Sequence, residues 1–445
     1  MKHPTLIASS LALAGLALCS TARADMVTDW NATLVAAATA STSTDLPPVA
    51  GRKAAIVQVA VYDAVNGIAR KYEPYLVTER APKGARQEAA AAQAAYTTLV
   101  ALYPALTAMF DTQLAASLAS LAGHEGHSQS IARGLAWGEH VANLVLAARS
   151  LDGFSATVPG YFGGTGPGVW RSLPTATAAD GTLAAVLPQF RYVVPFAMTS
   201  PDQFRPGPPP ALSSPEYAAD VNETKAIGRV DSATRTDDQT KLAQLWAAAD
   251  LNEFRIAQQV LPHDASLIDN ARLFALLGIE GCDAFIAVFD AKYTYNLWRP
   301  YHAIRLADTD GNALTDPDPN WTALIFAPRH QEYASAHGVF TGGFMRVLAR
   351  VLGNKHTFTL SVPSIPTFTW TFDRFSDATA QVKEARIWAG IHYRNSVNVG
   401  AVMGVALGDY VVENVLLPRH HHDDDGDQDR DRDEGHGDDD GHGHH

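Results

Sequence analysis

Three short segments in the C-terminal half contain the residue types that bind a tetrahedral oxyanion, namely cations, a serine and histidines. The first segment is KYTYNLWRP, from Lys292 to Pro300. Seven residues are nearly two turns of an α-helix, so a continuous helix would place Lys292 and Arg299 on one side, about 10 Å apart along its axis. Two long cationic side chains on one side can converge on a single anion. Alone, this pair is weak evidence, because such cations more often lie on a solvated face.

The second segment is EYASAHG, from Glu332 to Gly338, and it precedes an apolar helical run that ends at Gly353. Ser335 stands where a helix N-cap belongs, so the backbone amides that follow, starting at Ala336, have no acceptor within the helix. Unpaired amides at a helix N-terminus bind anions. His337 lies in the first turn, where it is placed to exchange a proton with a bound oxygen. Alone, the segment also fits an ordinary capped helix with an exposed histidine.

The third segment is RIWAGIHYRNS, from Arg386 to Ser396. Six residues of continuous helix rotate by about 240°, so Arg386 and His392 would not share a face. Gly390 predicts a break that brings them together. Arg386 then supplies a third positive charge, and His392 supplies an imidazole nitrogen able to bond directly to the central atom of the anion. Arg394 fits a surface cation instead.

The elements that must position these segments are helical. Segments rich in alanine, leucine and valine, without strand-like alternation, predict helices at 52–69, 87–121 with an interruption at Pro104, 128–151, 236–249, 265–292, 335–352, 378–390 and 396–416. The first of these is apolar on two faces and is expected to be buried. A stretch rich in glycine and proline, 152–215, is irregular and long enough to suggest a function. We therefore predict an all-α protein of two packed helical bundles.

This pattern divides the chain into four parts. Residues 1–24 read as a signal peptide, with an apolar run and a small-x-small cleavage site at Ala22-Arg23-Ala24. An N-terminal helical region, 25–215, ends in the glycine- and proline-rich stretch, and 216–419 forms a C-terminal helical catalytic region. The tail at 420–445 has seven histidines, eleven acidic residues and no apolar residue, so we expect it to be disordered.

The composition excludes several classes of protein. Of 445 residues, 47% are hydrophobic and 18% charged, which excludes a disordered chain. The net charge is −13, much of it in the tail, and the mildly acidic remainder argues against binding to nucleic acid. After the leader no stretch reaches the roughly 18 apolar residues of a membrane span. We expect a soluble, periplasmic or secreted protein; its oligomeric state is not predicted.

In this order, Lys-x6-Arg-Pro, Ser-x-His-Gly and Arg-x5-His resemble the signature of the type 2 phosphatidic acid phosphatase and vanadium haloperoxidase superfamily. The likeness extends over most of the mature chain, because three further segments are similar to soluble bacterial vanadium-dependent haloperoxidases, at 54–66, 138–153 and 168–174. The resemblance implies an all-helical double bundle with vanadate in a positively charged cradle.

The resemblance also implies a role for each matching residue. Groups that bind the equatorial oxygens of vanadate would come from Lys292, Arg299, Ser335, Ala336 and Arg386. His392 would be the axial ligand of the metal, and His337 would act as acid or base on the opposite side. Such an enzyme uses the bound vanadate to oxidise halide with hydrogen peroxide. His330 matches a position where bromoperoxidase-like members carry histidine, which favours bromide over chloride.

Two alternative functions remain open. The same cradle serves phosphoryl transfer, because five-coordinate vanadate resembles the transition state of phosphate-ester hydrolysis. In a soluble acid phosphatase His392 would become the nucleophile, forming a phosphohistidine, and His337 would protonate the leaving oxygen, with no cofactor. The third hypothesis is a secreted metal-binding protein on an inactive scaffold, with divalent metals captured by the tail at 420–445. A plain solvated acidic tail is the simpler interpretation.

The sequence departs from the family pattern at two positions. Ala336 stands where the family has glycine; since only its amide is required, we expect the methyl group to be tolerated. Ser396 stands four residues after His392, where many members have aspartate. Loss of that carboxylate is expected to lower the basicity of His392 or to loosen its orientation.

Overall fold

The computed structural model describes residues 25–41, 45–122, 128–175, 177–248, 251–362 and 365–419. The predicted signal peptide at 1–24 and the predicted tail at 420–445 lie outside these residues. The α-helices of the described chain are α1 (Met26–Ala40), α2 (Pro47–Ala69), α3 (Gln87–Leu102), α4 (Thr107–Leu121), α5 (Ser128–Ser150), α6 (Pro215–Ile227), α7 (Asp237–Leu245), α8 (Asn252–Gln259), α9 (Leu267–Tyr295), α10 (Pro300–Arg305), α11 (Ala336–Leu352), α12 (Phe375–Trp388) and α13 (Arg394–Asn414). The predicted all-α class is confirmed.

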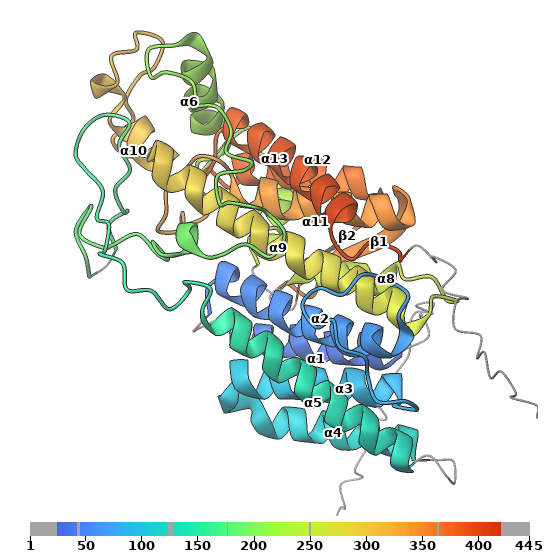
Figure 1. The fold of residues 1–445 in the computed structure, drawn as a ribbon. Helices are drawn as coiled ribbons and strands as arrows, with labels where there is room; N and C mark the ends of the chain where they lie inside the picture. The colour runs from blue at the N-terminus through green and yellow to red at the C-terminus, as the bar shows by residue number, and fades with distance from the viewer. Residues whose placement is uncertain are drawn as a thin grey trace, which may run out of the picture.

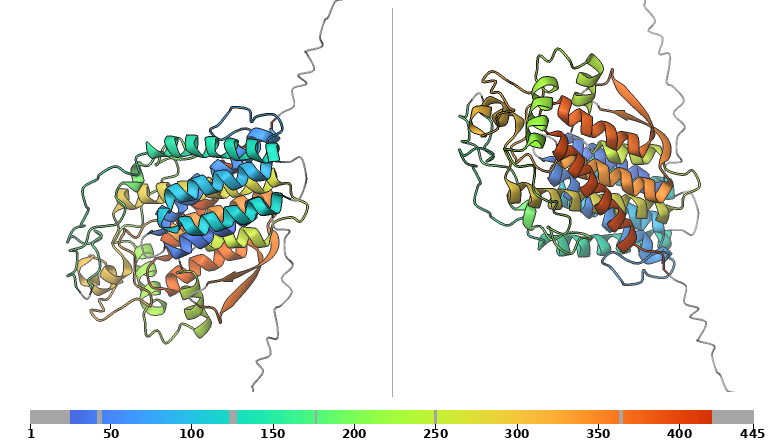
Figure 2. Two further views of the ribbon diagram at one scale, coloured as in Figure 1. Left: turned by 90° about the horizontal axis from the view of Figure 1, so that it is seen from below. Right: turned by 90° about the horizontal axis from the view of Figure 1, so that it is seen from above.

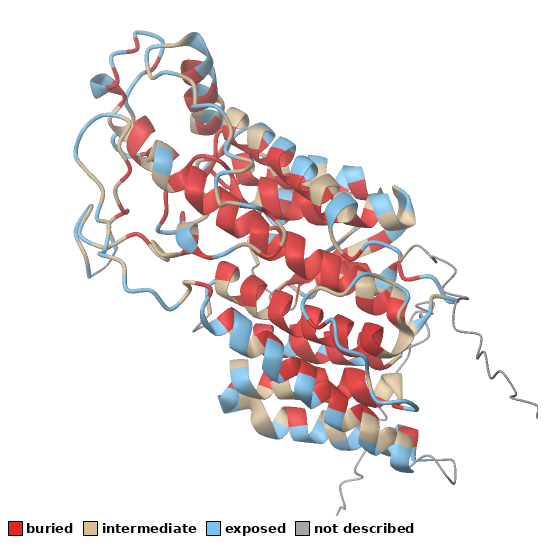
Figure 3. Ribbon diagram, viewed as in Figure 1, coloured by how far each residue is buried: buried red, intermediate tan, exposed pale blue. Residues whose placement is uncertain are grey.

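The helices form two packed bundles, with α1 to α5 on one side and α9 with α11 to α13 on the other (Figure 1). Helix α2 lies against α9, and both are buried over most of their length (Figure 3). A helix without a polar face must be covered on all sides, so this pair forms the centre of the core. Irregular segments gather at one end of the bundles, together with α6 and α10 (Figure 2).

The sequence analysis did not predict the helices α1 and α6. It also missed the short helices α8 and α10 and an antiparallel hairpin of β1 (Lys355–Ser361) and β2 (Thr369–Arg374). In the hairpin, Phe358 pairs with Phe372, and both rings are buried. A helix of six to eight residues, or an isolated hairpin, is marginal in water and is stabilised by tertiary packing, which local patterns do not report.

Helices α11 and α13 approach closely along a row of glycines. A Cβ atom on Gly404 would lie 2.2 Å from the carbonyl oxygen of Val339, so a larger residue would force the helices apart. The N-terminal ends of the two helices also lie close together, because the amide of Ser335 donates a hydrogen bond to the carbonyl of Ser396 at 3.2 Å. This contact fixes the second predicted segment against the third.

The glycine- and proline-rich stretch supports the end of α9. The amide of Trp170 donates to the carbonyl of Asn296, and the amide of Trp298 donates to the carbonyl of Gly168, both at 2.9 Å. Further along, three consecutive amides from Phe196 donate to the buried carboxylate of Asp283 in α9. The stretch therefore holds the turn that follows α9 in place.

Three further observations bear on possible partners. No single described helix is long and apolar enough to span a membrane; α3 and the segment Pro104–Leu121 meet that criterion only as a pair, bent by 119°. Among the described residues, no group of three or more histidine, cysteine, aspartate or glutamate side chains could hold a metal ion. Cys282 is a buried free thiol. The predicted metal capture by the tail concerns residues outside the described part of the chain.

Glu280 in α9 makes folding stability depend on pH. Its side chain is fully buried, and neither carboxyl oxygen has a hydrogen-bond partner among the described residues. Burial, and then the charges of Asp283 and Glu253, raise the pKa of Glu280 well above its ordinary value. The folded state therefore holds a proton that the unfolded state releases, so stability is fully present at low pH and is lost as pH rises towards the folded-state pKa.

We expect Glu280→Gln to remove this loss, because the amide has the same shape and never ionises. Urea unfolding from pH 5 to pH 8 should show the wild type losing about 1.4 kcal/mol per pH unit relative to the variant. The other buried acidic residues are present in both proteins, so their contributions cancel in the difference between the two free energies of unfolding. Parallel stability curves for the two proteins would show that Glu280 is ionised in the folded state.

Candidate active site

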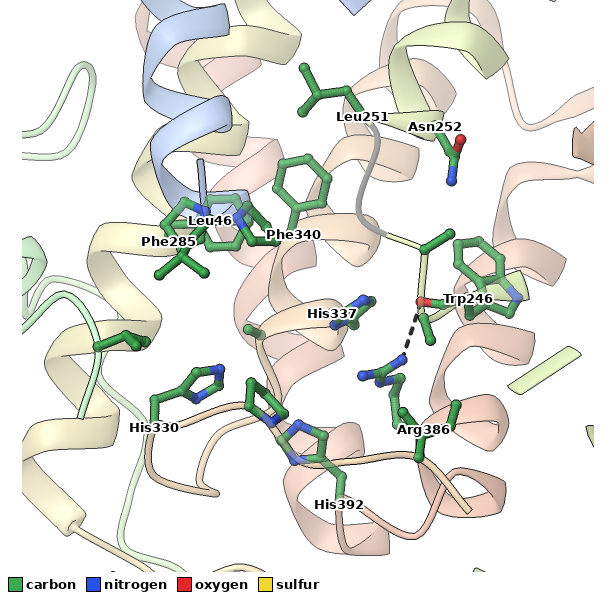
Figure 4. A pocket seen from close by; sticks show the side chains of 18 of the residues that line it. Leu46, Trp246, Leu251, Asn252, Phe285, His330, His337, Phe340, Arg386 and His392 are labelled. Atoms are coloured by element: carbon green, nitrogen blue, oxygen red, sulfur yellow. Dashed lines mark hydrogen bonds between the residues drawn. The ribbon is translucent and has the colours of Figure 1, made fainter. Parts of the chain in front are cut away.

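A cavity of about 280 Å³ lies where the two bundles meet. Its inner end is formed by His330, His337, Arg386 and His392, which point towards one another (Figure 4). Its outer wall is apolar and includes Leu46, Leu251, Phe285, Phe289, Phe326 and Phe340. The residues predicted to bind an oxyanion thus lie at the bottom of a largely apolar chamber.

The structure brings all the predicted site residues to this region, in two layers. Those that line the cavity are His330, Ala336, His337, Arg386 and His392. Those that lie behind it, each without exposed surface, are Lys292, Arg299 and Ser335. The second layer contacts the first through the hydrogen bonds described below.

The prediction that Lys292 and Arg299 share one helix is wrong. Helix α9 ends at Tyr295, because Asn296 adopts the left-handed conformation with φ 52°. Arg299 is the extended N-cap residue of α10, since the following Pro300 disfavours a helical conformation for the residue before it. The two cations converge because the chain turns between them.

The ammonium group of Lys292 is hydrogen-bonded to the loop that precedes α11. Its ammonium group donates to the carbonyls of Gln331 and Glu332 at 2.9 Å each, and to that of Ala334 at 2.5 Å. An ammonium group has three donors, so all are used. Burial and then Arg299 lower the pKa of Lys292, against the opposing effect of Glu332. Lys292 therefore shapes the loop that carries Ser335, and it contributes to the cavity through its charge.

Arg299 fixes two histidines through its guanidinium group. Nη2 lies 3.0 Å from Nδ1 of His330, and Nη1 lies 3.2 Å from Nε2 of His392. Arginine can only donate, so Nε2 of His392 accepts and carries no proton. Nδ1 of His330 lies between this guanidinium group and the carbonyl oxygen of Gln331, which is 3.1 Å away. Nε and Nη1 also donate to the carbonyls of His330 and Ile391, at 2.9 and 2.8 Å. Arg299 thereby holds the second and third predicted segments together.

His392 is a neutral imidazole of defined tautomer. Since Nε2 accepts from Arg299, the ring proton is on Nδ1, which donates to Oε1 of Glu332 at 2.7 Å. Burial, and then the charges of Arg299 and Lys292, lower the pKa of His392 well below its ordinary value. Its Nε2 lone pair is therefore free to bond to an electrophilic centre whenever Arg299 gives way.

Glu332 is a functional residue that the sequence did not reveal. It is fully buried, and Oε1 accepts both from His392 and from the amide of Tyr393, the latter at 3.1 Å. Burial raises the pKa of Glu332 to about 7, although Arg299 and Lys292 act in the opposite direction. The only sequence signal was its position at the start of the EYASAHG segment, sixty residues from its partner histidine.

Arg386 reaches the cavity because the chain breaks after α12, as predicted at Gly390. That glycine has φ 77°, and a Cβ atom on it would lie 2.3 Å from the carbonyl oxygen of Gly228. One guanidinium nitrogen of Arg386 donates to the carbonyl of Trp246 at 3.1 Å (Figure 4). Burial and then Arg299 lower the pKa of Arg386, but a guanidinium remains protonated.

Two buried donors beside the cavity have no acceptor. Ser335 is the N-cap residue of α11, yet its hydroxyl makes no capping bond, and it is buried without a partner among the described residues. Nε of Arg386 is unpaired in the same sense. The first helical hydrogen bond joins Val339 to Ser335, so the amides of residues 336–338 have no acceptor within the helix. Unpaired buried donors are costly, and a tetrahedral oxyanion supplies the missing acceptors. The residues present therefore fit vanadate or phosphate.

His337 and His330 complete the inner end of the cavity. The pKa of His337 is lowered by burial and then by Arg386, and that of His330 is lowered by burial and then by Lys292 and Arg299. Both rings are consequently neutral, as His392 is. His337 keeps some surface facing the cavity, whereas His392 is almost fully covered. A neutral, accessible imidazole beside a cation can exchange a proton with a bound oxygen.

Comparisons with known proteins agree with this picture. Residues 272–419 match the family model described as the VCPO second helical-bundle domain. The structure is similar to that of a bacterial vanadium-dependent iodoperoxidase, at 23% identity and a TM-score of 0.74, over 88% of this chain and 98% of that one. It is also similar to an apo bacterial vanadium-dependent chloroperoxidase, at 16% identity and a TM-score of 0.67, over 83% and 94% of the two chains. No curated protein matches the chain.

The protein is a helical double bundle with buried cations, histidines and unpaired donors at the inner end of its cavity. The chain has the fold of bacterial vanadium haloperoxidases, as the resemblance in the sequence implies, and residues 272–419 match the model of the second helical-bundle domain of that family.

Proposed function

We propose that the protein is a vanadate-dependent haloperoxidase, which oxidises halide with hydrogen peroxide. One observation carries the proposal: an unprotonated Nε2 of His392 lies among buried cations and unpaired donors at the end of a cavity. This arrangement fits an oxyanion whose central atom accepts a nitrogen ligand. The similarity to the structures of a bacterial vanadium-dependent iodoperoxidase and chloroperoxidase supports the same activity.

In this proposal, vanadate would be held by Ser335, Arg386, the amides that begin α11 and Nε2 of His392. When bound, vanadate supplies the activation of hydrogen peroxide towards attack by halide. The chain supplies positive charge in a site with little water, where each charge acts strongly. His337 exchanges the proton that the reaction moves, since its neutral ring lies beside Arg386.

We further propose bromide as the preferred halide, through His330. Nδ1 of His330 lies 3.0 Å from Nη2 of Arg299 and 3.1 Å from the carbonyl oxygen of Gln331. In this proposal Nδ1 accepts from Arg299, so the ring proton is on Nε2, which is then available as a donor to an anion. The ring lines the cavity and lies 5.6 Å from that of Phe289, so an anion beside it would be partly desolvated. Bromide is more weakly hydrated than chloride, so it loses less hydration free energy when it enters such surroundings.

Acid phosphatase activity is the second candidate, and the same unprotonated Nε2 of His392 favours it. A phosphohistidine forms when an imidazole lone pair attacks phosphorus and the bond from phosphorus to the leaving oxygen breaks. That oxygen would take a proton from His337 in its imidazolium form, which requires acid pH because burial lowers the pKa of this ring. The buried donors that fit vanadate fit phosphate equally well.

A vanadate titration followed by two assays distinguishes these activities. We expect peroxide-dependent oxidation of bromide to rise from zero to saturation as vanadate is added. Hydrolysis of p-nitrophenyl phosphate in the absence of vanadate, with no oxidation of bromide at any vanadate concentration, would favour the phosphatase and contradict the proposal. Deletion of 420–445 should leave bromide oxidation unchanged; if metal binding by the tail were the only activity, nothing measurable would remain.

A further inference from the structure

A carboxylate contributed by the loop before α11 sets the orientation of His392. We propose that Glu332 is the positioning residue of this site, which holds the ring so that Nε2 faces the cavity without a proton. Its Oε1 lies 2.7 Å from Nδ1 of His392, and both side chains are almost completely buried. The inference rests on the proposed function, because its purpose is to present Nε2 to an oxyanion.

The hydrogen-bond chain through this ring allows one arrangement only. Arg299 donates to Nε2, so Nδ1 must carry the proton, and Glu332 is the acceptor that receives it. Turning the ring over would remove both bonds and leave a buried carboxylate and a buried guanidinium facing carbon atoms. The carboxylate of Glu332 and the guanidinium group of Arg299 are both fully buried, so the turned ring is strongly disfavoured.

Glu332 is itself held firmly on the other side. Its Oε1 accepts from the amide of Tyr393, and its backbone carbonyl accepts from the ammonium group of Lys292. The carboxylate is thus fixed to the residue that follows His392 as well as to His392. Fixing both the ring and its neighbour is what a positioning residue requires.

A second, independent observation concerns Ser396, in the first turn of α13. Its hydroxyl and Oε2 of Glu332 are both buried without a partner that meets hydrogen-bond geometry. They nevertheless lie close to each other, since the hydroxyl of Ser396 interacts with the carboxyl group of Glu332. A longer acidic side chain at position 396 would extend into the space beside His392 that the carboxylate of Glu332 occupies. One carboxylate fits there, and two would repel each other.

This geometry predicts that Ser396→Asp weakens vanadate binding in the wild type but strengthens it in the Glu332→Gln variant. Glu332→Gln keeps the shape and an acceptor but loses the charge, and we expect it to weaken vanadate binding about 10- to 100-fold. Ser396→Asp alone should also weaken binding, because it adds a second negative charge. The double variant should recover most of the wild-type affinity, since the carboxylate then comes from α13. Glu384→Gln is the matched control: this half-buried glutamate pairs with Arg394, and its substitution should leave vanadate affinity unchanged.

The measurement is equilibrium dialysis of the full chain against sodium orthovanadate, with thermal melting of the vanadate-free proteins to verify folding. If the double variant binds no better than Glu332→Gln, or if Glu332→Gln binds like the wild type, the inference is wrong. Nitrogen-15 NMR of the wild-type imidazoles gives a test that needs no variant. We expect His392 to be protonated on Nδ1 only, and a proton on Nε2 would overturn the inference.

These outcomes separate the inference from the proposed function. If the wild type binds vanadate and the substitutions behave as described, but bromide is not oxidised, the proposed function fails and the role of Glu332 stands. If bromide is oxidised and Glu332→Gln has no effect on vanadate affinity, the role of Glu332 fails and the proposed function stands.

Discussion

Substitution of His392 by alanine is expected to reduce vanadate-dependent bromide oxidation by at least about 100-fold, the upper end of the loss seen when only a partner of a metal ligand is removed. The reason is that Nε2 of this ring is the one unprotonated nitrogen placed by Arg299 and Glu332 at the end of the cavity. The initial rate of bromide oxidation at saturating vanadate and peroxide is the quantity to measure. Equilibrium dialysis should show a matching loss of vanadate affinity.

A control for this substitution is His140→Ala. His140 is exposed on α5 and its ring pairs with Glu79, far from the cavity residues in the chain. Its loss should leave the rate unchanged. Bromide oxidation by His392→Ala at more than a tenth of the wild-type rate would mean that another group is the ligand.

Substitution of Arg386 by methionine is expected to separate activity from stability. Arg386 is buried, its Nε is unpaired, and no acidic side chain among the described residues forms an ion pair with it. Removing an uncompensated buried cation in favour of an apolar side chain of similar size should leave the melting temperature unchanged or raise it. Bromide oxidation should fall about 100- to 1000-fold, as when one donor of an oxyanion site is removed.

Calorimetric melting and steady-state kinetics on the same preparations measure both effects. Arg350→Met is the matched control, because Arg350 lies on α11 at the surface and pairs with Asp409 and Glu413. It should lose a little stability and no activity. If Arg386→Met melted several degrees lower and kept its activity, Arg386 would be a structural residue.

Most of the site could be predicted from the sequence, because its chemistry lies in three short segments of fixed spacing. The Gly390 break was predictable for the same reason, since only a chain reversal lets Arg386 and His392 meet. The helix predicted at 265–292 agrees closely with α9, Leu267–Tyr295, but the spacing argument for Lys292 and Arg299 assumed a helix that continues to Arg299, whereas the left-handed Asn296 ends α9 and Pro300 begins α10. The spacing of residues within a segment can be read directly from the sequence, whereas the point at which a helix ends depends on weaker local signals.

The role of Glu332 could not be predicted, for a physical reason. Its partner is sixty residues away, and the contact exists only because Lys292 and Arg299 hold the two loops together. The sequence analysis expected His392 to lack a carboxylate partner because Ser396 stands where many members have aspartate, but Glu332 supplies a carboxylate to the ring from another segment. The fold shows the same limit: α2 and α9 are long and apolar enough to predict, whereas α8 and α10 depend on their packing.

The central claim is that Nε2 of His392 and the buried donors around it form a cradle for one five-coordinate oxyanion. A crystal structure of the full chain soaked with orthovanadate tests it most directly. We predict vanadium at bonding distance from Nε2 of His392, with its oxygens hydrogen-bonded to the hydroxyl of Ser335 and to Nε of Arg386. Vanadate bound elsewhere, or a ring of His392 whose Nε2 remains bonded to Arg299 in the loaded protein, would contradict the claim.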